Sequence, residues 1–238
     1  MLSTHHSLAN CNRYAQQEIV TIFVGKERKL YRLHKDLLRN RSPYFATRLK
    51  DCWDGTQAEI ELTHVSTRSF EVAIDWMYSE SVPEYVPKKI GDKGPLLIDL
   101  AELYQVADLL MITQLQNQLV DTELHDAREL ENHWTLAGVV SAHVHGVTHT
   151  PLYQLILKDY VKHMLDEPLG VNAFRNKTAI LQEHPQAAID VLHTIHDYNR
   201  SKWAYPCNGN FCEFHVHPDG QICDSSSESP PNKKIKRP

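Results

Sequence analysis

The sequence predicts an α+β fold, in which a small mixed sheet and a cluster of helices are followed by an all-α extension. Two observations predict the sheet. Residues 19–25 form a β-branched, apolar run typical of a strand covered on both faces, and residues 58–62 alternate apolar with acidic residues. A third observation predicts the extension, because beyond His125 the strand signals stop while apolar residues at helical spacing continue.

The first two strands are expected to form a hairpin. Residues 25–28 supply a turn that begins with a glycine. Residues 29–33 then mix apolar and cationic residues, which suits a partner strand with one wetter face. A short helix is expected to follow over residues 34–39.

Two serines mark the starts of further helices. Ser42 precedes Pro43, and this pair is favourable because serine caps a backbone N–H while proline lacks the donor that a first turn leaves unpaired. That helix should run to about Lys50. Ser66 precedes a helix with one apolar stripe at i, i+3, i+4, i+7 and i+8 spacing. The stripe consists of Phe70, Ala73, Ile74, Met77 and Tyr78.

The predicted order is strand, strand, helix, helix, strand, helix. This order, with the segments LHKDLL, RSPYF and IEL…SFEVAIDWMY in place, resembles the BTB/POZ family from residue 18 to about residue 121. Helices over residues 97–108 and 112–119 would complete the helical hairpin of that family. The resemblance implies a BTB/POZ fold, a structural role for His34, and protein–protein interaction without catalysis.

The region after this domain predicts helices over residues 134–147, 151–165 and 185–198. It is similar to the helical region that follows the BTB domain in many fungal BTB proteins. In those proteins a Y-x-x-T…S-P-L-R element takes the place of HVHGVTHTPLYQL. Here His145 stands in the place of the tyrosine and Tyr153 in that of the arginine.

Five segments follow from these patterns and from composition. They are a flexible N-terminal arm (1–17), a BTB/POZ domain (18–124), a helical extension (125–202), a Cys/His-rich element (203–224) and a disordered basic tail (225–238).

The overall composition excludes several classes of function. A formal net charge of −5 argues against direct nucleic-acid binding, because phosphate contacts need a basic surface. Five cysteines are an odd number and residues 1–17 are polar, so we expect a reducing, intracellular setting. No apolar run approaches the ~20 residues of a membrane-spanning helix, so we expect a soluble protein. With nine glycines and no phosphate-loop or nucleophile motif, we expect no enzyme.

The sharpest chemical pattern lies in residues 207–223. Soft thiolates and imidazoles packed into so few residues are ligands that Zn²⁺ prefers, and the segment is too short to fold on apolar burial alone. A turn over residues 218–220 would bring His215 opposite Cys223, although alternation along a straight strand would turn Cys212 away. The alternative is a loose tail with oxidisable thiols and no metal. The candidate zinc ligands are Cys207, Cys212, His215, His217 and Cys223.

The basic tail fits the K-K-x-K-R form of a nuclear import signal, formed by Lys233, Lys234, Lys236 and Arg237. Such a run fills acidic grooves on a carrier. The alternative is a solvated charge run without function. We expect a nuclear protein, with the cytoplasm as the other location.

The BTB resemblance also implies partners. BTB domains commonly form homodimers, and many dock onto cullin scaffolds as substrate-recruiting subunits of ubiquitin ligases. Cullin docking in the family often uses a hydrophobic-x-Glu element, for which this chain offers Trp53-Asp54-Gly55. Trp53 is the candidate knob, Gly55 replaces the glutamate, and the alternative is that Trp53 covers a helix end. The competing function is a nuclear transcription or chromatin-associated regulator without a cullin, and no membrane partner is expected.

Overall fold

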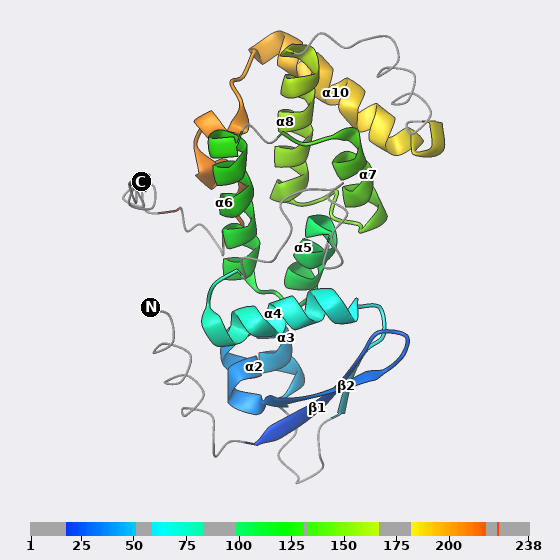
Figure 1. The fold of residues 1–238 in the computed structure, drawn as a ribbon, viewed down its shortest axis with the longest axis vertical. Helices are drawn as coiled ribbons and strands as arrows, with labels where there is room; N and C mark the ends of the chain where they lie inside the picture. Colours follow the sequence, from blue (N-terminus) through cyan, green and yellow to red (C-terminus); the bar gives the residue numbers. More distant parts are fainter. Residues whose placement is uncertain are drawn as a thin grey trace, which may run out of the picture.

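The computed structural model describes residues 18–50, 59–82, 99–130, 133–166, 182–217 and residue 223. The sheet with the first helices forms one end of the molecule, and the later helices form the other end (Figure 1). In chain order the elements are β1 (Ile19–Val24), β2 (Lys29–His34), α2 (Lys35–Arg41), α3 (Pro43–Arg48), β3 (Glu59–Leu62), α4 (Thr67–Ser79), α5 (Leu100–Leu109), α6 (Thr113–Leu130), α7 (Leu136–Val144), α8 (Pro151–Asp166), α10 (Pro185–Ser201) and the 3₁₀ turns η1 (Pro206–Asn208) and η2 (Phe211–Phe214).

The described strands form one mixed sheet, as predicted, and their order in the sheet is β2-β1-β3. β2 pairs antiparallel with β1, and β3 pairs parallel with it. Val20, Ile22 and Val24 are at most 2% exposed, whereas Ile19 on the other face is 42% exposed. Burial of β1 is therefore heavier on the face that packs against the helices.

The hairpin turn depends on Gly25. Its φ is +75°, a conformation that side-chain-bearing residues rarely adopt. A Cβ at this position would also lie 3.1 Å from Cγ2 of Thr67. The Gly25 N–H donates to the carbonyl of Leu62 at 3.0 Å, which ties the turn to the end of β3.

The two predicted serine caps are confirmed. The Ser42 hydroxyl accepts from the Phe45 N–H at 3.3 Å and donates to the Leu110 carbonyl at 2.6 Å, so the cap of α3 also fixes the end of α5. The Ser66 hydroxyl accepts from the Ser69 N–H at the start of α4. Both caps are local features, which explains why the sequence predicts them.

Helix α4 packs on the sheet and against α5. The ring of Phe70 meets the ring of Tyr31 on β2 edge to face, with centroids 5.3 Å apart. Trp76 is 1% exposed, and its indole N–H donates to the Gln118 side chain of α6 at 2.7 Å. Residues outside the predicted stripe are thus buried as well, because α4 is covered by both the sheet and the later helices.

Helix α6 is longer than the predicted helix of residues 112–119. It runs from Thr113 to Leu130, and Leu115, Leu119 and Leu124 are each at most 1% exposed. The predicted division between residues 124 and 125 falls inside this continuous helix. α6 therefore belongs to both the N-terminal domain and the extension.

The extension consists of α7, α8 and α10, in good agreement with the predicted helices. α8 contacts both α7 and α10. A partly buried polar cluster joins all three, because the Tyr153 hydroxyl donates to Asp190 at 2.7 Å and lies 2.6 Å from Nε2 of His143. No helix among the described residues combines the length and apolarity needed to cross a bilayer.

Candidate functional site

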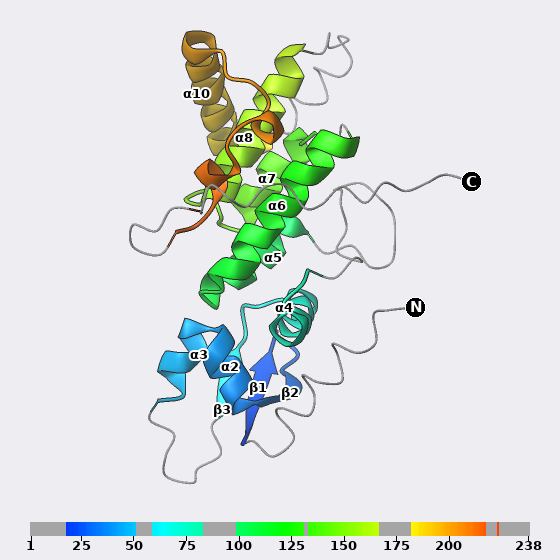
Figure 2. The same ribbon diagram turned by 90° about the vertical axis from the view of Figure 1, so that its left-hand side faces the viewer.

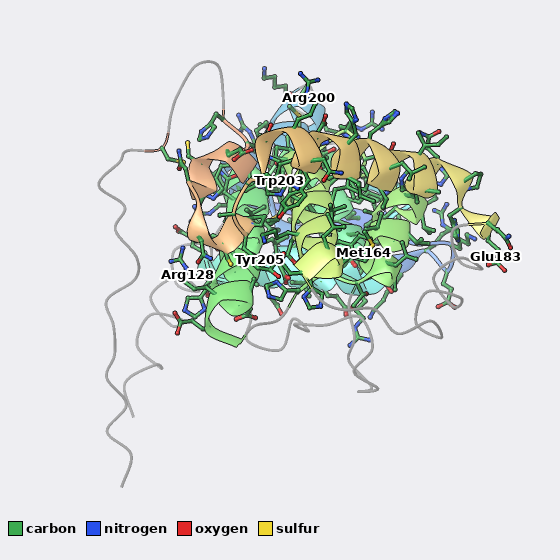
Figure 3. The ribbon with its side chains drawn as sticks, turned by 90° about the horizontal axis from the view of Figure 1, so that it is seen from above. Arg128, Met164, Glu183, Arg200, Trp203 and Tyr205 are labelled. Atoms are coloured by element: carbon green, nitrogen blue, oxygen red, sulfur yellow. The ribbon has the colours of Figure 1, made fainter. Side chains whose placement is uncertain are left out.

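After α10 the chain turns back along α6 and α8. We call residues 203–217 with Cys223 the C-terminal element; it contains η1 and η2, which contact both helices. Figures 1 and 2 show these turns beside α6 from two directions. Seen from above, Trp203 and Tyr205 lie on the segment that leads from the end of α10 toward Arg128 (Figure 3).

Asn117 of α6 holds the far end of this element by its backbone. Its side-chain N–H donates to the carbonyl of Val216 at 3.0 Å, and its side-chain oxygen accepts from the Val216 N–H at 2.8 Å. An amide side chain that pairs with both backbone groups of one residue imitates a strand partner. This pairing holds the backbone of Val216, which lies between His215 and His217.

Arg128, about three turns further along α6, holds the near end. Its Nε–H donates to the Cys207 carbonyl at 2.8 Å, and its guanidinium lies 4.8 Å from the ring centroid of Phe211. Arginine suits this position because its planar group can donate in two directions and stack on a ring.

Three potential metal ligands converge between these two anchors. One ligand atom each of Cys212, His217 and Cys223 lies within 4.8 Å of the others, and all three residues are half-buried. Nε2 of His217 is 3.2 Å from the Cys212 sulfur and 3.8 Å from the Cys223 sulfur, and it also lies 3.2 Å from the Cys212 carbonyl oxygen. Two thiols and an imidazole in this arrangement could hold a metal ion.

His215 adjoins this group. Its Nδ1 is 3.0 Å from the Cys223 sulfur, and its Nε2 is 2.9 Å from a carboxylate oxygen of Asp121. Because a carboxylate accepts hydrogen bonds, it places the ring proton on Nε2. In the neutral imidazole, Nδ1 then presents a lone pair toward Cys223.

The environment of Cys223 opposes ionisation when no cation is near. Burial raises the pKa of this thiol above its ordinary value, and the neighbouring Cys212 and Asp121 add to the effect. A bound dication would reverse this balance, because a coordinating thiol loses its proton.

The predicted ligands thus fall into two sets. Cys212 returns to His217 because residues 211–214 form a 3₁₀ turn rather than the straight strand that would turn it away. Cys207 is not among the clustered ligands. Its carbonyl is bound by Arg128, which lies seven residues beyond Asp121 on α6 and so ~10 Å further along the axis. Burial, with the Asp159 carboxylate next, raises the pKa of the Cys207 thiol.

Cys207 instead lines a pocket of about 480 Å³ with Arg128, His133, His163 and Tyr205. The ring of His133 stacks on the rings of His163 and Tyr205, with centroids 4.7 and 4.5 Å away. The buried Asp159 accepts from His133 at 3.0 Å and from the Trp134 N–H at 2.7 Å. These contacts join α8 to the segment before α7, which is a structural role for the carboxylate.

Several predicted site residues lie outside the described residues. They are the cullin knob Trp53 with Asp54, the import signal Lys233, Lys234, Lys236 and Arg237, and the turn over residues 218–220. His34 is described, and its Nδ1 lies 2.7 Å from the Tyr78 hydroxyl, joining β2 to α4.

The comparisons with known proteins bear on the N-terminal region. A family model for the BTB/POZ domain matches residues 12–125. This chain contains a BTB/POZ domain. The match spans all three described strands and most of α6, as the sequence resemblance predicts. BTB domains are in general protein–protein interaction modules and not catalytic domains.

One similar solved structure is the BTB domain of human gigaxonin. It is 18% identical to this chain with a TM-score of 0.37, and the likeness covers 51% of this chain and 94% of that one. No curated protein sequence matches the chain. The assignment of the BTB domain therefore depends on the family match. The predicted likeness of the extension to fungal proteins stays a prediction.

Sequence reasoning missed the α6 side of the candidate metal site. Asn117 and Asp121 lie within the matched BTB domain and contact residues 99 and 94 positions away in the sequence, respectively. Their spacing with Arg128 is i, i+4 and i+11, which places the three on one face of a helix. The available signal was the placement of these three polar residues on one face of an amphipathic helix.

Proposed function

We propose that this chain is a protein–protein interaction adaptor that acts through its BTB domain. The observation that carries the proposal is the BTB/POZ match over residues 12–125. The proposed chemistry is binding, without catalysis.

We further propose that the BTB domain forms a homodimer. In the described sheet, β2 lies at one edge, and Leu30 on its outer face is 50% exposed. Exposed apolar side chains beside a strand edge favour pairing with another chain. Light scattering at several protein concentrations tests the dimer.

The first partner to test is a cullin scaffold. Pull-down of purified cullins by the full-length chain should succeed and should be weakened by Trp53→Ala, because an apolar knob fills a cullin pocket in the related proteins. Trp134→Ala is a matched control, since Trp134 lies outside the BTB match. Failure of the intact chain to bind any cullin would remove the ligase function and leave the adaptor without it.

A second candidate is a nuclear regulator that assembles protein complexes without a cullin. The basic run Lys233 to Arg237 favours it, because this pattern is read by import carriers. Deletion of the last six residues should move the protein out of the nucleus. An unchanged distribution would retire this candidate.

We also propose that the ion held by the thiol–imidazole cluster is zinc, in a structural role. Two cysteines and histidine nitrogens are the ligand set that Zn²⁺ prefers in closed structural sites. Elemental analysis of the purified chain should find zinc, and Cys212→Ser should lose it. Equal metal content in the two proteins would contradict zinc binding at this cluster.

A further inference from the structure

The thiol–imidazole cluster offers four possible metal ligands, which are Cys212, His215, His217 and Cys223. Three of them, Cys212, His217 and Cys223, lie closest together. Around a tetrahedral zinc with Zn–S near 2.3 Å and Zn–N near 2.0 Å, neighbouring ligand atoms are about 3.3–3.8 Å apart. The separations of His217 from Cys212 and Cys223 are 3.2 and 3.8 Å, and that of His215 from Cys223 is 3.0 Å. His215 lies outside the group of three ligand atoms that are within 4.8 Å of one another, so it must move toward Cys212 and His217 to complete a four-coordinate site.

His215 is prepared for this role by Asp121. Metal-ligating histidines usually donate their other ring N–H to a carboxylate, which fixes the tautomer and the ring orientation. The Nε2–H of His215 donates to Asp121 in this way, so the lone pair on Nδ1 is the one that can bind a metal ion. The His215 side chain is 10% exposed, so its ring is enclosed against α6.

The orienting carboxylate comes from a different part of the chain than the ligands. Asp121 lies on α6 inside the BTB match, and so does Asn117, which fixes the backbone between His215 and His217. All four ligands lie in the C-terminal element. A metal held here therefore joins the end of the chain to the last helix of the BTB domain.

We propose that Cys212, His215, His217 and Cys223 form a four-coordinate zinc clasp, in which Asp121 orients His215 so that the ion fastens the C-terminal element to α6 of the BTB domain. The inference rests on the zinc proposed above and adds the fourth ligand, the orienting residue and the mechanical role. Cys207 is excluded from the clasp, because its anchor on α6 is two turns away from Asp121.

Two measurements on the full-length chain test the ligand set. Cobalt(II) replaces zinc and reports four-coordinate geometry and thiolate ligation in its visible and near-ultraviolet absorption. The wild type should show both signatures. His215→Ala should lose the four-coordinate signature, Cys212→Ser and Cys223→Ser should weaken thiolate ligation, and Cys207→Ser should leave the spectrum unchanged.

Competition with a chelator measures the role of Asp121. Asp121→Asn should weaken zinc binding by about 10–100-fold, the usual effect of losing such a partner. Glu129→Gln is the matched control, because Glu129 is an exposed carboxylate on the same helix. Hydrogen exchange should show faster exchange of residues 203–217 after zinc removal, with no change in β1, β3 or α4.

The outcomes separate the clasp from the zinc proposal. Absence of zinc and of cobalt binding, or a Cys212–Cys223 disulfide in place of metal, would overturn both. Zinc binding that is insensitive to both His215→Ala and Asp121→Asn, or zinc removal without faster exchange of residues 203–217, would overturn the clasp and leave a simple metal site.

Discussion

The BTB domain and the C-terminal element are held in place by different forces. In the domain, sheet and helices bury large side chains completely, including Phe45, Phe70 and Trp76. The described C-terminal element buries little apolar surface, chiefly through Phe214 and Cys207, and its regular structure is limited to the short turns η1 and η2. Such short 3₁₀ turns do not persist on their own.

The element instead depends on a small number of polar contacts from α6 and α8, several of which come from one face of α6. Asn117, Asp121 and Arg128 each reach it from α6. The comparison teaches that one helix serves two purposes: its apolar face completes the BTB domain, while its polar face receives the end of the chain. Substitutions on the two faces should therefore have separable effects.

The largest expected effect comes from the apolar face of the BTB domain. Phe70→Ala removes a fully buried ring and should lower the free energy of unfolding by about 3–5 kcal/mol, through lost burial and the cavity left behind. Denaturant unfolding measures this change. Leu192→Ala on α10 is the control, because Leu192 is 63% exposed and its loss should cost less than about 0.5 kcal/mol. Equal costs for the two variants would break the comparison.

A smaller and local effect is expected at Arg128. Arg128→Ala should weaken docking of the C-terminal element by about 1.5–3 kcal/mol, because the variant loses a charged hydrogen-bond donor and leaves the Cys207 carbonyl unpaired. Hydrogen exchange of residues 203–217 should quicken while that of β1 stays the same. Arg200→Ala, at an exposed arginine of α10, should change neither. Faster exchange throughout the BTB domain would show that the two regions unfold together.

The smallest effect concerns alkaline pH. Burial raises the pKa of Tyr160 on α8 from 10.0 to about 12. The neutral phenol therefore stabilises the folded chain fully below pH 10, and this contribution is lost as the pH rises toward 12, by at most about 1.4 kcal/mol per pH unit. Tyr160→Phe should flatten this part of the stability profile. An unchanged slope would mean that Tyr160 ionises equally well in the folded chain.

The sequence predicts what is local and misses what is distant. The caps at Ser42 and Ser66 are visible because each depends on a backbone group three residues away. The role of Asn117 is invisible because its partner Val216 is 99 residues away, and composition assigns no partner to a single amide. The same reason explains Cys207, since its residue type fits a metal ligand and only the path of the chain along α6 separates it from Cys212.

The full length of α6 could not be predicted for a related reason. Strand signals stop near residue 125, but α6 continues to Leu130 with the same helical periodicity. When a helix passes from one set of neighbours to another, the periodicity of its apolar residues does not change. The candidate metal ligands Cys212, His217 and Cys223 could be predicted from their residue types, whereas the contact between His215 and Asp121 requires the fold.

The central claim is that the BTB domain joins protein chains, whereas the metal fastens only the C-terminal element. Light scattering of the full-length chain, with and without a zinc chelator, tests it most directly. We predict a mass of twice 27.4 kDa in both conditions, because the dimer depends on the BTB domain. A single-chain mass at every concentration, or a dimer that falls apart when the metal is removed, would contradict the claim.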